Sequence, residues 1–127
     1  MQSDVPLVVP EINPDALARY RARGIIANPN CTTIVMLMPL KPLHDYGRVR
    51  RVIVSSYQAV SGAGAKGIEE LRRQTLAWAR GEPIEIRAFP QQIAFNLIPH
   101  IDTFQPNGYT KEEMKLVFEI RKILGDE

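Results

Sequence analysis

The 127-residue chain has little of several features that mark special classes of protein. It contains one cysteine, carries a net charge of only +2, and lacks an uninterrupted apolar run of the roughly 18 residues that a membrane span needs. One cysteine cannot form a disulfide within the chain, so we expect a reducing, cytoplasmic compartment, with neither export nor membrane insertion. The small charge excludes nucleic acid as an expected partner. Its densest basic cluster, Arg48, Arg50 and Arg51, is short and lacks aromatic residues.

What is present is ordinary for a globular domain. Apolar residues make up 45% of the chain and charged residues 24%. A chain of this length buries about two-thirds of the surface that it would expose when unfolded, which is enough for one core. We therefore expect no structural metal or disulfide, and no cluster of Cys, His and Asp has the spacing of a zinc site.

The pattern of apolar residues predicts alternating strands and helices. Apolar, β-branched runs predict strands at residues 5–12, 25–27, 49–60 and 84–89. The first contains Pro6 and Pro10 and so belongs at a sheet edge, whereas the third reads as a buried strand. The fold class is therefore α/β, of the α+β-like kind, with a mixed sheet and flanking helices.

Capping residues and helical periodicity predict four helices. Their ranges are residues 15–23, 31–38, 68–80 and a last helix that follows Thr110. Pro39 and Pro42 are expected to kink or end the second helix. The third is expected to bury an apolar stripe that includes Ile68 and Trp78, and Gly81 caps its end. Glu113 completes a capping box with Thr110 at the start of the last helix.

Cys31 is the first candidate for chemistry. It directly follows Asn28-Pro29-Asn30 and begins a predicted helix, so its sulfur lies at the positive end, where a thiolate and a developing oxyanion are both stabilised. The alternative is a small buried core residue. A thiolate nucleophile needs a base, and the chain has only His44, about 20 Å away on a continuous helix, and His100. A Cys31–His100 hydrolase and a non-catalytic oligomerisation module therefore remain alternatives.

Three other patterns could hold a ligand. Gly62-x-Gly64-x-x-Gly67 matches the dinucleotide fingerprint between a predicted strand and helix, although it lacks the acidic residue about 20 positions on and suits a tight turn equally well. Gln58, at the end of a buried strand, needs a polar partner or a ligand. Glu112 and Lys115 share one helix face, where they could bind a ligand or form an exposed ion pair worth under about 1 kcal/mol.

Four motifs together resemble one enzyme family, the aspartate-β-semialdehyde dehydrogenases. They are Asn-Pro-Asn-Cys-Thr-Thr at residues 28–33, Ser-Ser-Tyr-Gln-Ala-Val-Ser-Gly-Ala-Gly at 55–64, Ala-Phe-Asn-Leu-Ile-Pro at 94–99 and Tyr-Thr-Lys-Glu-Glu-Met-Lys at 109–115. The resemblance implies a partial catalytic and dimerisation domain of a glyceraldehyde-3-phosphate-dehydrogenase-like fold. Residues 1–30 would be the end of the nucleotide-binding domain and the lead-in to the nucleophile turn, and residues 31–127 a partial catalytic subdomain.

The resemblance also implies a reaction. The family uses NADPH to convert L-aspartyl 4-phosphate to L-aspartate 4-semialdehyde in lysine, methionine and threonine biosynthesis, and it forms homodimers. Its motifs assign a thioester to Cys31, substrate orientation to Gln58, phosphate binding to Asn30 and Lys115, the substrate amino group to Glu112, and the nicotinamide end of NADP to Ser61 and Gly62. The family's nucleotide-binding glycine loop and its later Arg and His have no counterpart here, so the chain alone is expected to be inactive.

Overall fold

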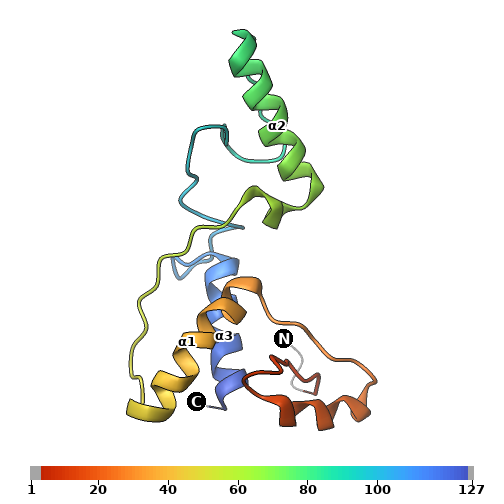
Figure 1. Cartoon of the computed structure of the whole chain (residues 1–127), viewed down its shortest axis with the longest axis vertical. Helices are drawn as coiled ribbons and strands as arrows, with labels where there is room; N and C mark the ends of the chain where they lie inside the picture. Colours follow the sequence, from red (N-terminus) through yellow and green to blue (C-terminus); the bar gives the residue numbers. More distant parts are fainter. Residues whose placement is uncertain (1–3, 126–127) are drawn as a thin grey trace. The chain divides into compact units, whose positions relative to one another are not determined.

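The computed structural model describes residues 4–125 and divides the chain into two compact units. Unit 1 comprises Met1–Val54 and Asp102–Glu127, and unit 2 comprises Ser55–Ile101. The elements, in chain order, are the 3-10 helix η1 (Pro14–Ala22), α1 (Cys31–Gly47), the 3-10 helix η2 (Val60–Ala63), α2 (Ala65–Arg80) and α3 (Lys111–Leu124) (Figure 1). Unit 1 thus contains η1, α1 and α3, and unit 2 contains η2 and α2.

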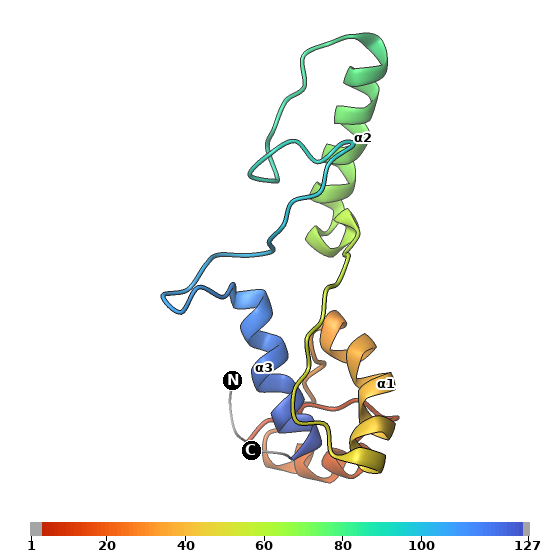
Figure 2. The same cartoon turned by 90° about the vertical axis from the view of Figure 1, so that its left-hand side faces the viewer.

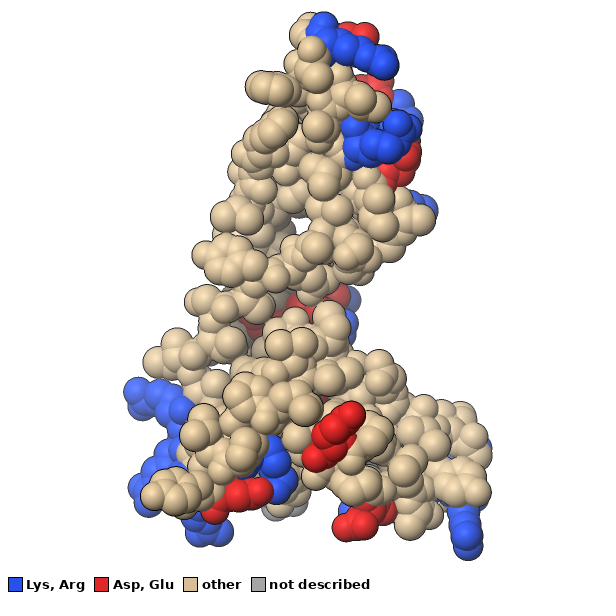
Figure 3. All heavy atoms as spheres, in the orientation of Figure 1, with Lys and Arg blue, Asp and Glu red and all other residues tan. Residues whose placement is uncertain are grey.

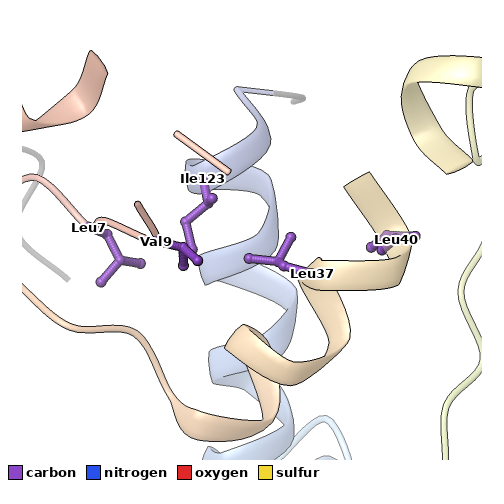
Figure 4. Packing of buried hydrophobic residues seen from close by; sticks show 5 residues of the cluster. All are labelled: Leu7, Val9, Leu37, Leu40 and Ile123. Atoms are coloured by element: carbon purple, nitrogen blue, oxygen red, sulfur yellow. The ribbon is translucent and has the colours of Figure 1, made fainter. Parts of the chain in front are cut away.

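The core of unit 1 forms where α1 packs against α3. Its buried apolar side chains come from three separate segments, the N-terminal segment, α1 and α3 (Figure 4). They are Leu7, Val9, Leu37, Leu40 and Ile123. Burying a side chain of this kind contributes about 1.5–3 kcal/mol, so this cluster is what holds the two helices and the N-terminal segment together.

The N-terminal segment turns instead of forming the predicted strands. The predicted strands at residues 5–12 and 25–27 meet only at an isolated parallel bridge between Leu7 and Ala27. The Asn13 side chain accepts a hydrogen bond from the Val9 N–H (2.8 Å) and donates one to the Leu7 carbonyl (3.0 Å). Asn13 is therefore used by the turn and makes no side-chain cap, and the residues after it form η1 in place of the predicted α-helix.

Helix α1 begins at Cys31, as predicted, but the two prolines do not end it. It continues through Pro39 and Pro42 to Gly47. Proline inside a helix removes one backbone hydrogen bond, and here the burial of Leu37 and Leu40 in the core offsets that loss. Arg48 is the C-cap that follows the helix. Its backbone is left-handed (φ 49°), and its N–H donates to the His44 carbonyl (2.8 Å).

In unit 2 the residues after α2 fold back along that helix (Figure 2). Gly81 ends α2 in the left-handed conformation (φ 67°), as predicted. The predicted apolar stripe was wrong, because Ile68 and Trp78 are exposed and the buried positions are Gly67, Glu70 and Gln74. On the exposed side of α2, acidic and basic side chains lie beside one another (Figure 3). In one such pair, Arg72 Nη2 lies 2.8 Å from Glu69 Oε1.

Two buried polar side chains of α2 hold the returning segment. The Glu70 carboxylate accepts hydrogen bonds from the backbone N–H groups of residues 87, 88 and 89. Gln74 accepts from the N–H groups of residues 93 and 94 (2.9 and 3.0 Å) and donates to the carbonyl of residue 85 (3.0 Å). The strand predicted at residues 84–89 does not form, because N–H groups that would bond a neighbouring strand bond Glu70 instead.

The predicted mixed sheet is not confirmed, and the described structure is mainly helical. Among residues 4–125, β pairing is limited to two isolated bridges, the one at Leu7 and one between Phe104 and Thr110. The buried strand predicted at residues 49–60 is instead exposed irregular chain followed by η2, with Ile53 87% and Tyr57 83% exposed. A strand needs a neighbouring backbone to satisfy its hydrogen bonds, and no described segment pairs with this one. None of the helices in the described range is long and apolar enough to cross a membrane.

Candidate functional site

The start of α1 places Cys31 at a well-capped helix N-terminus. The first N–H groups of a helix have no partner within it, and asparagine is among the preferred caps. Asn30 is the cap here, and its Oδ1 accepts from the N–H groups of Thr32 (2.9 Å) and Thr33 (3.3 Å). Cys31 is the first helical residue and is exposed. The buried-core alternative for Cys31 is therefore wrong, and its position at the positive end of α1 is the predicted one.

The start of α3 places a carboxylate and a cation one turn apart. The predicted capping box is confirmed, because Thr110 Oγ1 accepts from the Glu113 N–H and Glu113 accepts from the Thr110 N–H. This box orders the first turn, which carries Glu112. The Glu112 carboxylate lies 2.8 Å from Lys115 Nζ, with side-chain exposures of 14% and 48%. The hydrogen bond that Lys115 donates to Glu112 raises the pKa of Lys115 against the opposing effect of burial, so the pair favours the charged form that lysine already has at neutral pH.

A set of hydrogen bonds joins these two helix starts. Asn30 Nδ2 donates to Glu112 Oε1 (2.6 Å), while the Asn30 backbone N–H donates to Glu119 Oε2 (2.9 Å). The same Glu119 oxygen accepts from Thr33 Oγ1 (2.7 Å). We call these four residues, Asn30, Thr33, Glu112 and Glu119, the α1–α3 junction. It fixes the residue preceding Cys31 from both its backbone and its side chain.

The junction contains two of the predicted site residues, Asn30 and Glu112, and Glu112 in turn binds a third, Lys115. Asn30 directly precedes Cys31. It also contains Glu119 and Thr33, which sequence reasoning did not single out as site residues. A signal for Glu119 existed in the spacing, because residues 112, 115 and 119 follow the i, i+3, i+7 pattern of one helix face. The arrangement presents an exposed thiol, a lysine cation and carboxylates, which suits recognition of a small molecule that carries both charges.

The histidines do not supply a base within unit 1. Because α1 is continuous, His44, thirteen residues after Cys31, is displaced about 20 Å along the helix axis. His100 belongs to unit 2. Among residues 4–125, no group of three or more His, Cys, Asp or Glu side chains is placed to hold a metal ion.

The remaining predicted residues, Gln58, Ser61 and Gly62, lie near one another in unit 2. Ser61 and Gly62 belong to η2, and the Gln58 side chain covers Gly62 so closely that a Cβ there would stand 1.8 Å from Gln58 Nε2. The glycine fingerprint begins inside this 3-10 turn and does not follow a strand. Packing explains the glycine at position 67, since a Cβ there would stand 2.5 Å from the Val60 carbonyl oxygen. The dinucleotide fingerprint requires a strand directly before its glycines, so the structure does not support a dinucleotide site here.

Comparisons with known proteins agree on one family. The family described as semialdehyde dehydrogenase, dimerisation domain, matches residues 40–127. An aspartate-semialdehyde dehydrogenase of Aquifex aeolicus is 57% identical over 128 residues, covering 100% of this chain and 38% of the relative. Aspartate-semialdehyde dehydrogenase 2 of Vibrio cholerae is 58% identical and covers 97% of the chain.

Solved structures give the same result. The crystal structure of aspartate semialdehyde dehydrogenase II from Vibrio cholerae, described as complexed with ASA, has a TM-score of 0.94 and 58% identity over 97% of this chain. The Francisella tularensis enzyme has a TM-score of 0.83 and 30% identity over 100% of this chain.

These matches cover 37% and 41% of the two solved chains, so this chain spans well under half the length of its relatives. The family match nevertheless covers more than half of the chain itself. The resemblance to aspartate-semialdehyde dehydrogenases is confirmed. The chain belongs to the semialdehyde dehydrogenase family and matches its dimerisation domain.

Proposed function

We propose that this chain is part of an aspartate-semialdehyde dehydrogenase that reduces L-aspartyl 4-phosphate to L-aspartate 4-semialdehyde with NADPH, in the synthesis of lysine, methionine and threonine. The Cys31 thiolate attacks the acyl carbon, the carbon–oxygen bond to phosphate breaks, and inorganic phosphate leaves, so that the acyl group is held as a thioester. A nicotinamide cofactor, when bound, would supply the hydride that reduces this thioester, and the carbon–sulfur bond then breaks, which releases the aldehyde and returns the Cys31 thiolate.

The observation that carries the proposal is the α1–α3 junction. Asn30 precedes the exposed Cys31 and donates to Glu112, which in turn holds Lys115. A thiol at a helix N-terminus lies beside the positive end of the helix dipole, which stabilises the thiolate and a developing oxyanion. The α1–α3 junction therefore supports covalent catalysis by Cys31.

The same residues suit the proposed substrate. In this proposal Lys115 and Asn30 bind its phosphate and Glu112 binds its amino group. The raised pKa of Lys115 keeps its positive charge at neutral pH, as phosphate binding requires. Both oxygens of Glu112 already accept hydrogen bonds, and a carboxylate has lone pairs left for an ammonium group.

Gln58, Ser61 and Gly62 have the remaining proposed roles. Gln58 orients the substrate, and Ser61 and Gly62 contact the nicotinamide end of NADP. These two lie in the exposed turn η2, where the Gln58 side chain packs over Gly62 on the side that a Cβ would occupy. The main nucleotide-binding residues would belong to a separate domain, with residues 1–30 as its end and residues 31–127 as part of the catalytic subdomain.

We also propose that the enzyme is a cytoplasmic homodimer and that this chain alone is inactive. The dimerisation-domain family supports the homodimer. Inactivity follows from the reaction, because hydride transfer needs the cofactor held near the thioester and acid–base help contributes a further 10²–10⁴-fold or so. Sedimentation of the chain tests the dimer.

A segment exchange tests the reaction. This chain replaces the matching segment of the Vibrio cholerae enzyme, and NADPH-dependent turnover of aspartyl phosphate is measured. We expect the chimera to turn over substrate and Cys31→Ser to lower turnover by roughly a thousandfold or more while the protein remains folded. Unchanged turnover in that variant refutes the proposal. Ester cleavage abolished by His100→Ala would instead indicate a hydrolase, and no activity of either kind would indicate an oligomerisation module.

A further inference from the structure

Glu119 contacts the start of α1 twice although it is not among the residues assigned to the reaction. One of its oxygens, Oε2, accepts from the Asn30 backbone N–H at 2.9 Å and from Thr33 Oγ1 at 2.7 Å. The Asn30 N–H precedes the helix, so no helical hydrogen bond satisfies it. Thr33 is fully buried (0% exposed), so its hydroxyl needs a partner within the protein.

The two contacts lie on either side of Cys31 in the sequence. The first constrains the backbone just before Cys31, and the second constrains the first turn of α1 just after it. Glu112 constrains the Asn30 side chain from one end of the same face of α3. Because α3 holds both the backbone and the side chain of Asn30, it largely sets the orientation of Cys31 at the start of α1.

We propose that Glu119 is a positioning residue that holds Cys31 at the N-terminus of α1 in a reactive geometry. It acts through Asn30 and Thr33 and touches no substrate. What matters is an acceptor oxygen at the Oε2 position, since one oxygen receives both hydrogen bonds. Its importance for catalysis rests on the proposed function, whereas its effect on the thiol does not.

A pair of variants separates the acceptor from the charge. Glu119→Gln and Glu119→Ala both remove the negative charge, but only the glutamine keeps an acceptor oxygen. In the full chain, the rate of Cys31 alkylation by iodoacetamide is measured from pH 6 to 9. We expect the Ala variant to react roughly threefold or more slowly than the Gln variant near neutral pH, because its thiol is no longer held at the helix terminus. Equal rates would overturn the proposal.

Asn13→Ala is the matched control. Asn13 also makes two hydrogen bonds in unit 1, to Val9 and Leu7, and neither is to the α1–α3 junction. Its alkylation rate is expected to equal that of the unmodified chain. An equal slowing in Asn13→Ala and Glu119→Ala would mean general loosening and would overturn the proposal. If Glu119→Ala does not fold, Thr33→Val against Thr33→Ser gives the same comparison, with the valine variant slower.

The catalytic consequence is measured in the chimera. Glu119→Ala is expected to lower kcat on the order of tenfold or more relative to Glu119→Gln, since small misplacement of a reacting group is costly. Equal kcat values in an active chimera would overturn the catalytic part. An inactive chimera would refute the proposed function alone, because the alkylation comparison needs no dehydrogenase activity.

Discussion

Different interactions stabilise the interior of each of the two units. Unit 1 has a cluster of buried apolar side chains from three segments, in which Leu37 is fully buried. In unit 2 the largest fully buried side chains, Glu70 and Gln74, are polar and bind the backbone of the segment that follows α2. Its aromatic pair, Trp78 and Phe95, has ring centroids 4.7 Å apart but remains exposed. Apolar packing thus organises one unit, and side-chain hydrogen bonds to backbone organise the other.

The largest expected effect is the loss of a core side chain in unit 1. Leu37→Ala removes buried apolar contacts and leaves a cavity, so we expect the free energy of unfolding to fall by about 2–5 kcal/mol. Val35→Ala, on the same helix but 72% exposed, is the control and is expected to cost under about 0.5 kcal/mol. Urea denaturation followed by circular dichroism measures both. Similar costs for the two variants would contradict the packing account of unit 1.

The next effect concerns unit 2. Glu70→Ala leaves the part-buried N–H groups of residues 87–89 without their acceptor, and a typical hydrogen bond of this kind contributes about 0.5–1.5 kcal/mol. Hydrogen exchange should therefore accelerate at these three amides. Glu69→Ala is the control, because Glu69 is half exposed and its bond to Arg72 is on the surface. Protected amides in the Glu70→Ala variant would mean that apolar contacts hold this segment after all.

The same contrast explains which parts of the fold were predictable. Three helix ends were, because capping acts over a few residues: Thr110 with Glu113, Gly81 after α2, and Cys31 as the first residue of α1 all follow local patterns. The end of α1 and the expected cap at Asn13 were not. The buried side of α2 was not, because periodicity assumes that an apolar stripe is buried. The exposed chain at residues 49–59 also has the composition of a strand, and composition cannot reveal whether a neighbouring strand is available.

The residues of the candidate site also differ in how far local sequence patterns could predict them. Cys31 and Asn30 could be recognised from the turn that precedes a helix, and Glu112 and Lys115 from their spacing. The contacts that join them span 82 to 89 residues of sequence, which no local pattern encodes. Helix spacing places Glu119 on the face of Glu112 and Lys115 but does not reveal its partners on α1. The roles of all seven site residues, Gln58, Ser61 and Gly62 among them, stay predictions that derive from family resemblance.

The smallest expected effect is a pH dependence confined to the segment that Glu70 holds. Burial by itself raises the pKa of Glu70, but the N–H groups of Ala88, Arg87 and Phe89 outweigh it and lower the pKa below its usual range. A carboxyl group whose pKa is lower in the folded than in the unfolded state stabilises the fold above the unfolded value, about 4.3, and loses that contribution as pH falls through the folded value.

Protection of amides 87–89 should therefore decrease as the pH falls below about 4 in the unmodified chain. In Glu70→Gln the acceptor oxygen remains and the titrating group is gone, so the decrease should disappear at these amides even if other carboxyl groups still titrate. Hydrogen exchange corrected for intrinsic acid catalysis measures both chains. An identical pH profile in the two would show that the charge of Glu70 does not contribute, and that a neutral acceptor is enough to hold the backbone. Unit 2 would then still depend on polar contacts, but it would lack the acid sensitivity that distinguishes a carboxylate-held segment from the apolar core of unit 1.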